Sequence, residues 1–270
     1  NALDANTTAS YNTALGASAL GANSTGANNV AVGSGALDAC TTASYNTCVG
    51  AGSLSASTTG HSNTVVGYNA LDAITTGSES VAIGAYALTQ ASGSSNVAVG
   101  LKALENVTTG TNNIALGKET GRASAAPGGD ITTADNQVVI GNNNIANAFV
   151  KVGWSTGSDV RDKTDIETLP DNAGLNFVNQ MRPVTYVWDN RTNYYDFKDP
   201  KYGERDHSKK EIRKHTGFIA QEVKEIEESI GWEDDHIVDT NNEHSLTLKY
   251  SALIPVLTKA IQELSTKVED

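Results

Sequence analysis

The sequence has few of the features that mark membrane, secreted or nucleic-acid-binding proteins. Its 270 residues include only two cysteines, which is too few for a disulfide framework. Lys and Arg number 19 against 31 Asp and Glu, so the formal net charge is −12 and no basic patch stands out. That charge argues against a nucleic-acid backbone or an anionic membrane as partner. No apolar run approaches the ~20 residues that span a bilayer, so we expect neither nucleic-acid binding nor membrane insertion.

Three further patterns are missing. The chain has no charged-then-apolar leader and starts within a repeat at Asn1, so we expect it to be a fragment of a longer protein. The repeats hold no paired carboxylates at recurring positions, which argues against glycoside hydrolysis. His207, His215, His236 and His244 lack metal-ligand spacing, so no metal or other cofactor is expected.

Composition changes sharply after Gly157. Residues 1–157 carry only 12 charged side chains, whereas residues 158–270 carry 38 and ten of the sixteen aromatics. Such a break marks a domain boundary. We expect a repeat shaft over 1–120, a neck with the last shaft strands over 121–157, and a separate domain over 158–270.

The first part of the chain is a seventeen-residue repeat. A glycine follows each short β-branched run, and successive glycines are 17 residues apart, apart from one step of 16. These glycines are Gly16, Gly33, Gly50, Gly67, Gly84, Gly100 and Gly117. A regular period of this length predicts a solenoid in which each repeat forms one rung. From Lys118 the pattern is expected to fail, with a loop over 121–135 and two last strands over 137–140 and 148–152.

Each rung is expected to contain one short strand that ends at its glycine. In Val30-Ala31-Val32 the two valines share one face and the alanine takes the other, so both faces are apolar or small. We therefore expect one face to pack on its own coil and the other on neighbouring chains, with three chains about an axis. Cys48 replaces an Ala or Val of other rungs, which favours a small buried thiol.

An asparagine enters most of these strands, from Asn12 to Asn113. Either these amides bind a ligand, or they stack as a hydrogen-bonded ladder along the solenoid; the ladder is the stronger interpretation. The run from Ser80 to Ala87 resembles the head repeat of trimeric autotransporter adhesins, which implies parallel β-rolls in threes. The longer period here leaves the handedness open.

The last 113 residues predict an α+β domain. We expect a helix over 172–181, a strand over 184–188, a long hairpin or mobile arm over 189–213, and a helix that follows the turn at Gly217 and ends near Ser229. The C-terminal helix carries a coiled-coil-like heptad seam of Ile254, Leu257, Ile261, Leu264 and Val268. The alternative is an ordinary amphipathic core helix.

Four motifs in this region occur in order. They are Ser158-Asp-Val-Arg-Asp-Lys163, Arg182-Pro-Val-Thr-Tyr-Val-Trp188, Gly217-Phe-Ile-Ala-Gln-Glu-Val223, and Leu248-Lys-Tyr250 continuing to Ala260-Ile-Gln-Glu-Leu264. Together they resemble the C-terminal intramolecular chaperone of phage tail spikes and fibres, the peptidase S74 or endosialidase chaperone family. The resemblance implies a domain that trimerises the chain, helps a β-helical shaft to fold, and then cuts itself off.

The same resemblance assigns roles around the composition break. It implies that Ser158 is the nucleophile, Lys163 the general base, and Gly157–Ser158 the scissile bond. A serine hydroxyl is a weak nucleophile unless a base takes its proton, and a lysine does so only when burial or a nearby cation lowers its pKa. Arg161 is the candidate cation, and Asp159 is expected to hold the turn or Arg161. His215 is a further supporting candidate, and an exposed polar turn at a domain joint is the alternative.

With the repeat shaft before it, the resemblance implies the C-terminal part of a phage tail fibre or spike. We expect a homotrimer assembled in the host cytoplasm and carried on the virion, with upstream fibre domains and a host-surface receptor as candidate partners. The domain over 158–270 is expected to be an autoproteolytic serine endopeptidase that acts once and on no external substrate. The competing interpretation is a trimeric surface adhesin with a static, non-cleaving trimerisation cap.

Overall fold

The computed structural model describes residues 1–122, 130–142, 144–145, 148–149, 151, 158–191, 194–195, 199–201, 203–232, 236–240 and 246–269. The chain divides into two compact units, Asn1–Ala146 with Arg191–Arg205, and Asn147–Asn190 with Asp206–Asp270. The boundary predicted at residue 157 falls in an undescribed stretch and stays a prediction. No helix of the described residues is long and apolar enough to cross a membrane.

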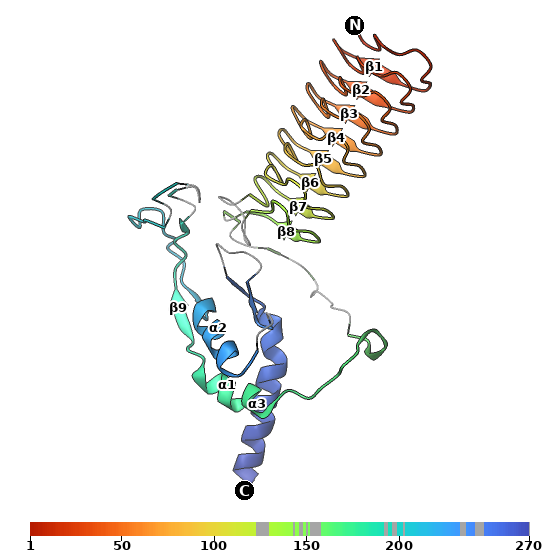
Figure 1. Cartoon of the computed structure of the whole chain (residues 1–270). Helices are drawn as coiled ribbons and strands as arrows, with labels where there is room; N and C mark the ends of the chain where they lie inside the picture. Colours follow the sequence, from red (N-terminus) through yellow and green to blue (C-terminus); the bar gives the residue numbers. More distant parts are fainter. Residues whose placement is uncertain are drawn as a thin grey trace. The chain divides into compact units, whose positions relative to one another are not determined.

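The repeats form the predicted parallel β-solenoid. Eight three-residue strands lie side by side in sequence order as one parallel sheet, stacked along the shaft (Figure 1). They are β1 Thr13–Leu15, β2 Val30–Val32, β3 Thr47–Val49, β4 Thr64–Val66, β5 Val81–Ile83, β6 Val97–Val99, β7 Ile114–Leu116 and β8 Val138–Ile140. Equivalent residues pair between rungs, as Thr13 does with Val30, so the seventeen-residue period sets the register.

The eighth rung corrects one prediction. The pattern does not fail at Lys118: β8 pairs with β7 in the same parallel register. The step from Gly117 to Gly141 is 24 residues, which is one period plus an insertion of seven. Of the strand expected over 148–152, residues 148, 149 and 151 are not in a strand, and residues 150 and 152 lie outside the described residues.

Small side chains from the strands and leucines from the turns, such as Leu54, fill the centre of the shaft. The middle residue of most strands is fully buried, as Ala31, Cys48 and Val65 are, while its two neighbours point outward. Cys40 and Cys48 are free and buried, and burial raises the pKa of the Cys40 thiol to about 11 and that of Cys48 further. The expectation of a small buried thiol at Cys48 is confirmed.

The asparagines form the predicted ladder. Asn46 Nδ2 donates to the Gly60 carbonyl at 2.9 Å, and Asn46 Oδ1 accepts from the Asn63 backbone N–H at 2.9 Å. The same pattern joins Asn29 to Asn46, and all three side chains are buried. These amides are occupied by backbone partners, so the structural interpretation is confirmed over ligand binding.

The second unit is built on three helices and two small ribbons. Helices α1 Leu175–Gln180, α2 Ala220–Ser229 and α3 Leu253–Glu269 appear in Figure 1. Strands β9 Val184–Tyr186 and β10 His215–Gly217 pair antiparallel, as do β11 Val238–Asp239 and β12 Thr247–Leu248. The hairpin expected around residues 189–213 is thereby confirmed at its base. The core comprises Phe177, Val223, Ile226, Ile237, Val238, Leu253 and Val256.

Candidate functional site

A short turn brings Ser158 and Lys163 together. Residues Val160–Asp162 form a single 3-10 turn, Asp159 caps its start by accepting from the Arg161 backbone N–H, and the Lys163 N–H closes it on the Val160 carbonyl. Because the chain reverses over this turn, the Lys163 Nζ donates to the Ser158 Oγ at 2.7 Å. The two residues that the motif singled out are therefore in hydrogen-bond contact within one chain.

Asp159 holds both the turn and Arg161. Its Oδ1 accepts from the Arg161 backbone N–H at 2.9 Å and from Arg161 Nε at 3.0 Å, and its Oδ2 accepts from Nε at 3.1 Å. The Arg161 guanidinium lowers the pKa of the Asp159 carboxyl, and the carboxylate in turn raises the pKa of Arg161. The Asp159 charge is thus matched by Arg161, which leaves the Lys163 amine directed at the serine.

The site is open in the single chain. Ser158, Lys163 and the turn between them are all exposed, and Val160 leaves 67% of its surface accessible. Gly157, the other half of the predicted scissile bond, lies outside the described residues. The candidate base and nucleophile are therefore paired but uncovered.

His215 belongs to the β9–β10 ribbon. Its ring stacks on Tyr186 with centroids 5.7 Å apart, and its Nε2 lies 3.2 Å from a Glu211 carboxylate oxygen. Among the described residues no contact joins His215 to Ser158 or Lys163. These contacts give the imidazole a packing role, and a catalytic one stays a prediction.

The C-terminal helix has two apolar faces. Leu253, Val256 and Ala260 are buried against the rest of the unit. The five seam residues lie on the other face and remain exposed: Ile254 63%, Leu257 44%, Ile261 68%, Leu264 50% and Val268 78%. The seam is therefore distinct from the face that packs into the core, which the alternative of an ordinary core helix does not explain.

The motifs contact one another within the unit. Arg182 and Glu222 form an ion pair between the second and third motifs. A Cβ on Gly217 would overlap the hydroxyl of Tyr250, whose oxygen accepts from the Phe218 N–H at 3.4 Å. Residue types at these positions are thus set by contacts between motifs that are distant in the chain.

The contacts of two glutamates were not predicted from the sequence. Glu263 on α3 accepts from the Leu175 N–H at 2.8 Å and so caps α1, where a Cβ on Gly174 would overlap the carboxylate. Glu227 on α2 is buried and accepts from the backbone N–H groups of Ile237 at 2.6 Å and Val238 at 3.3 Å. A glycine just before a helix was the signal for Glu263; no local pattern indicated Glu227.

The described residues hold no group of three or more metal-ligating side chains, and His244 lies outside them. Neither the curated proteins nor the solved structures contain a match to this chain. A family model does match residues 158–232, from the candidate serine to the end of the α2 region. That family is described as the chaperone of endosialidase, Peptidase S74, and its match together with the β-solenoid fits a tail spike or fibre with a C-terminal domain similar to this family.

Proposed function

We propose that the C-terminal domain trimerises the chain, helps the solenoid shaft of a phage tail fibre or spike to fold, and then cleaves the Gly157–Ser158 bond. The observation that carries the cleavage is the 2.7 Å contact between Lys163 Nζ and Ser158 Oγ, at the start of the segment that matches the family. The family as a whole is one of self-cleaving peptidases, and the pair supplies the nucleophile and base that such cleavage needs.

The position of the serine defines the chemistry. Ser158 lies on the leaving side of the bond, so its Oγ attacks the carbonyl carbon of the residue before it. Neutral Lys163 takes the hydroxyl proton and returns it to the leaving α-nitrogen. The result is an ester on Ser158 Oγ and a free α-amine on the same residue. Water then hydrolyses the ester, which releases the shaft carboxylate and restores the hydroxyl.

Two uncovered apolar surfaces support trimerisation. One is the seam on α3. The other is the outer face of the shaft sheet, where Leu15, Val66 and Ile83 among others remain 39 to 67% exposed. Parallel sheets are ordinarily covered on both faces, and a stripe of this length along eight strands is typical of an interface. A second and third copy, each with the same rung spacing, match this face.

Assembly also explains how an exposed dyad becomes active. A lysine acts as a base only when neutral, and loss of water around it favours the neutral form. Ser158 and Lys163 are exposed in one chain. Docking of neighbouring chains would bury them, so that cleavage follows completed assembly.

Denaturing gel electrophoresis tests the cleavage. Wild type is expected to give two bands, while Ser158→Ala and Lys163→Met give one. Ser251→Ala, an exposed serine in the same unit, is the control and should give two. Hydroxylamine, which attacks esters, is expected to speed cleavage of the wild type. Identical single bands for wild type and Ser158→Ala would favour the static trimerisation cap.

A further inference from the structure

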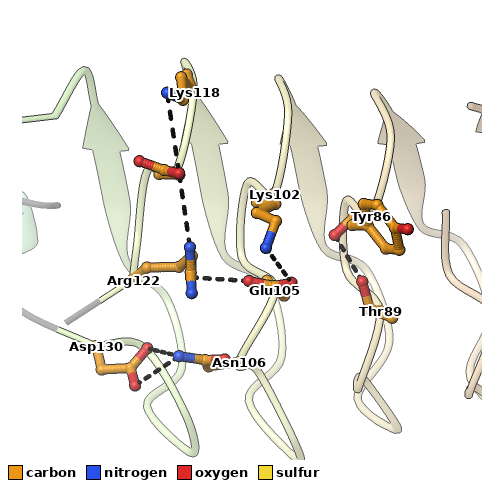
Figure 2. Close-up of polar contacts among 9 residues, drawn as sticks. Tyr86, Thr89, Lys102, Glu105, Asn106, Lys118, Arg122 and Asp130 are labelled. Carbon is orange, nitrogen blue, oxygen red and sulfur yellow. Dashed lines mark hydrogen bonds and ion pairs between the residues drawn. The ribbon is translucent and has the colours of Figure 1, made fainter. Parts of the chain in front are cut away.

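The side chains that follow the strand-ending glycines change from small to large or charged along the shaft. After each strand the chain turns, and in the first three rungs the two residues that follow the glycine are small: Ala17, Ser18, Ser34, Gly35, Ala51 and Gly52. In later rungs large or charged residues take these two places: Tyr68, Tyr86, Lys102 and Lys118. Glu105 and Arg122, five residues after their glycines, lie beside the lysines, and we call these six residues the ridge; Figure 2 shows all of them except Tyr68. Since the first rungs fold with small residues in these places, the fold does not require the ridge.

The ridge gathers the positive charge of the shaft. Lys102, Lys118 and Arg122 are the only Lys or Arg in residues 1–122. They lie among carboxylates: Glu105 pairs with Lys102 at 3.3 Å and with Arg122 at 2.8 Å, and Lys118 lies 4.0 Å from Glu119 (Figure 2). Donors and acceptors are thus held in fixed positions, which lowers the entropy cost of binding a polar partner.

Aromatic rings continue the ridge. Tyr68 is 52% exposed, and its ring meets that of Tyr86 edge to face with centroids 5.4 Å apart. The Lys102 ammonium lies 5.6 Å from the centre of the Tyr86 ring. Along the shaft axis the surface therefore passes from the ring faces of Tyr68 and Tyr86 to the ion-paired polar groups that begin at Lys102.

We propose that the ridge binds a glycan, a chain of pyranose rings lying along the shaft. A pyranose has an apolar C–H face, whose positive edge suits the negative face of an aromatic ring. It also has hydroxyls that donate to carboxylates and accept from Lys and Arg, and such charge-assisted bonds are the stronger ones. Strands lie about 4.8 Å apart, similar to the length of one sugar unit, so each rung meets one ring. The proposal does not depend on the cleavage.

The repeat itself supplies substitutions that the fold already accommodates. Tyr68→Ala places there the residue of Ala51, and Tyr86→Asn that of Asn69, which has the same left-handed backbone. Tyr45→Ser is the matched control, because Tyr45 is 65% exposed away from the ridge and Ser62 holds the equivalent place one rung later. Lys118→Ala introduces the residue that Ala17 provides at the equivalent place in the first rung, and it tests whether the ligand is acidic or neutral.

The test is binding of the full chain to a glycan array that spans neutral, acidic and amino sugars. We expect the wild type to bind at least one class of glycan on the array. The Tyr68→Ala/Tyr86→Asn variant should bind that glycan about tenfold more weakly, and Tyr45→Ser should bind it as the wild type does. If the ligand is an acidic glycan, Lys118→Ala should weaken the binding of acidic glycans and leave the binding of neutral ones unchanged. No retained glycan, or equal retention by the double variant, overturns the proposal. If the double variant unfolds at a lower temperature but binds the glycan as the wild type does, the ridge serves shaft stability instead.

Discussion

The two units of this chain are stabilised in different ways. In the shaft, the same backbone and amide contacts recur rung after rung, as with the N–H of Thr47 on the carbonyl of Asn63 and that of Thr64 on Ser80. In the C-terminal unit, single side chains such as Glu227 and Glu263 make contacts that occur once. The shaft therefore depends on backbone geometry and repetition, whereas the C-terminal unit depends on individual side chains.

The largest effect is expected where shaft geometry is broken. Gly67 has φ +145°, and a Cβ there would lie 2.5 Å from the Gly84 carbonyl oxygen. Gly67→Ala should cost about 3 kcal/mol or more in the free energy of unfolding, from backbone strain and overpacking. Thermal unfolding followed by circular dichroism measures it. Gly35→Asn is the control, because its Cβ meets nothing within 4 Å and Asn69 holds the same place. Equal losses for both variants would contradict this account.

Next comes the seam on the C-terminal helix. Leu257→Ser combined with Ile261→Ser should leave the single unit folded, since both side chains are exposed in it, yet abolish trimers and slow cleavage. Analytical ultracentrifugation and the gel assay report the two effects. Lys267→Ser on the same helix should change neither. Efficient cleavage by the double variant as a monomer would show that the dyad needs no neighbouring chain.

A smaller effect is expected from one buried carboxylate. Glu227→Gln keeps the size but replaces one acceptor oxygen with an N–H₂ that faces a backbone donor, so unfolding of the C-terminal unit should become easier by about 1–3 kcal/mol. Urea denaturation measures the change. Glu225→Gln, exposed on the same helix, should stay within about 0.5 kcal/mol of wild type. No difference between the two would mean that the contacts of Glu227 are dispensable.

The smallest expected effect is a gain in shaft stability. Ser80 interrupts the asparagine ladder: its Oγ accepts from the Asn96 N–H at 3.2 Å, and its short side chain offers no amide. Ser80→Asn should add one ladder contact and stabilise the shaft by about 0.5–1.5 kcal/mol, seen as a higher unfolding temperature. A destabilised variant would show that the sixteen-residue step beside this rung has no space for the amide.

The sequence was sufficient to predict the features that repeat along the chain or that depend on a few neighbouring residues. The period identified the strands up to β7, and Ser158 and Lys163 meet because one short turn separates them. The strand expected over 137–140 is confirmed as β8, but its place as an eighth rung in the same register was not predicted, because a seven-residue insertion hides the period. The leucine four residues after a strand-ending glycine adopts φ near +50°, which leucine rarely does, so residue propensity did not predict this conformation. These leucines are Leu20, Leu37, Leu54, Leu71, Leu88 and Leu104. The contacts of Glu263 and Glu227 join residues that are distant in the chain, and for Glu227 no local pattern indicates them.

The register of the shaft has a consequence for how such chains diversify. Since each rung bonds only to the rungs beside it, in-frame duplication of one seventeen-residue unit would lengthen the shaft by about 4.8 Å and leave every other contact unchanged. The left-handed leucines and the glycine corners fix the strand register, and the single sixteen-residue step, confined to a turn, leaves that register unchanged. Shaft length is therefore a quantity that recombination can change in whole units, independently of the domain that folds it.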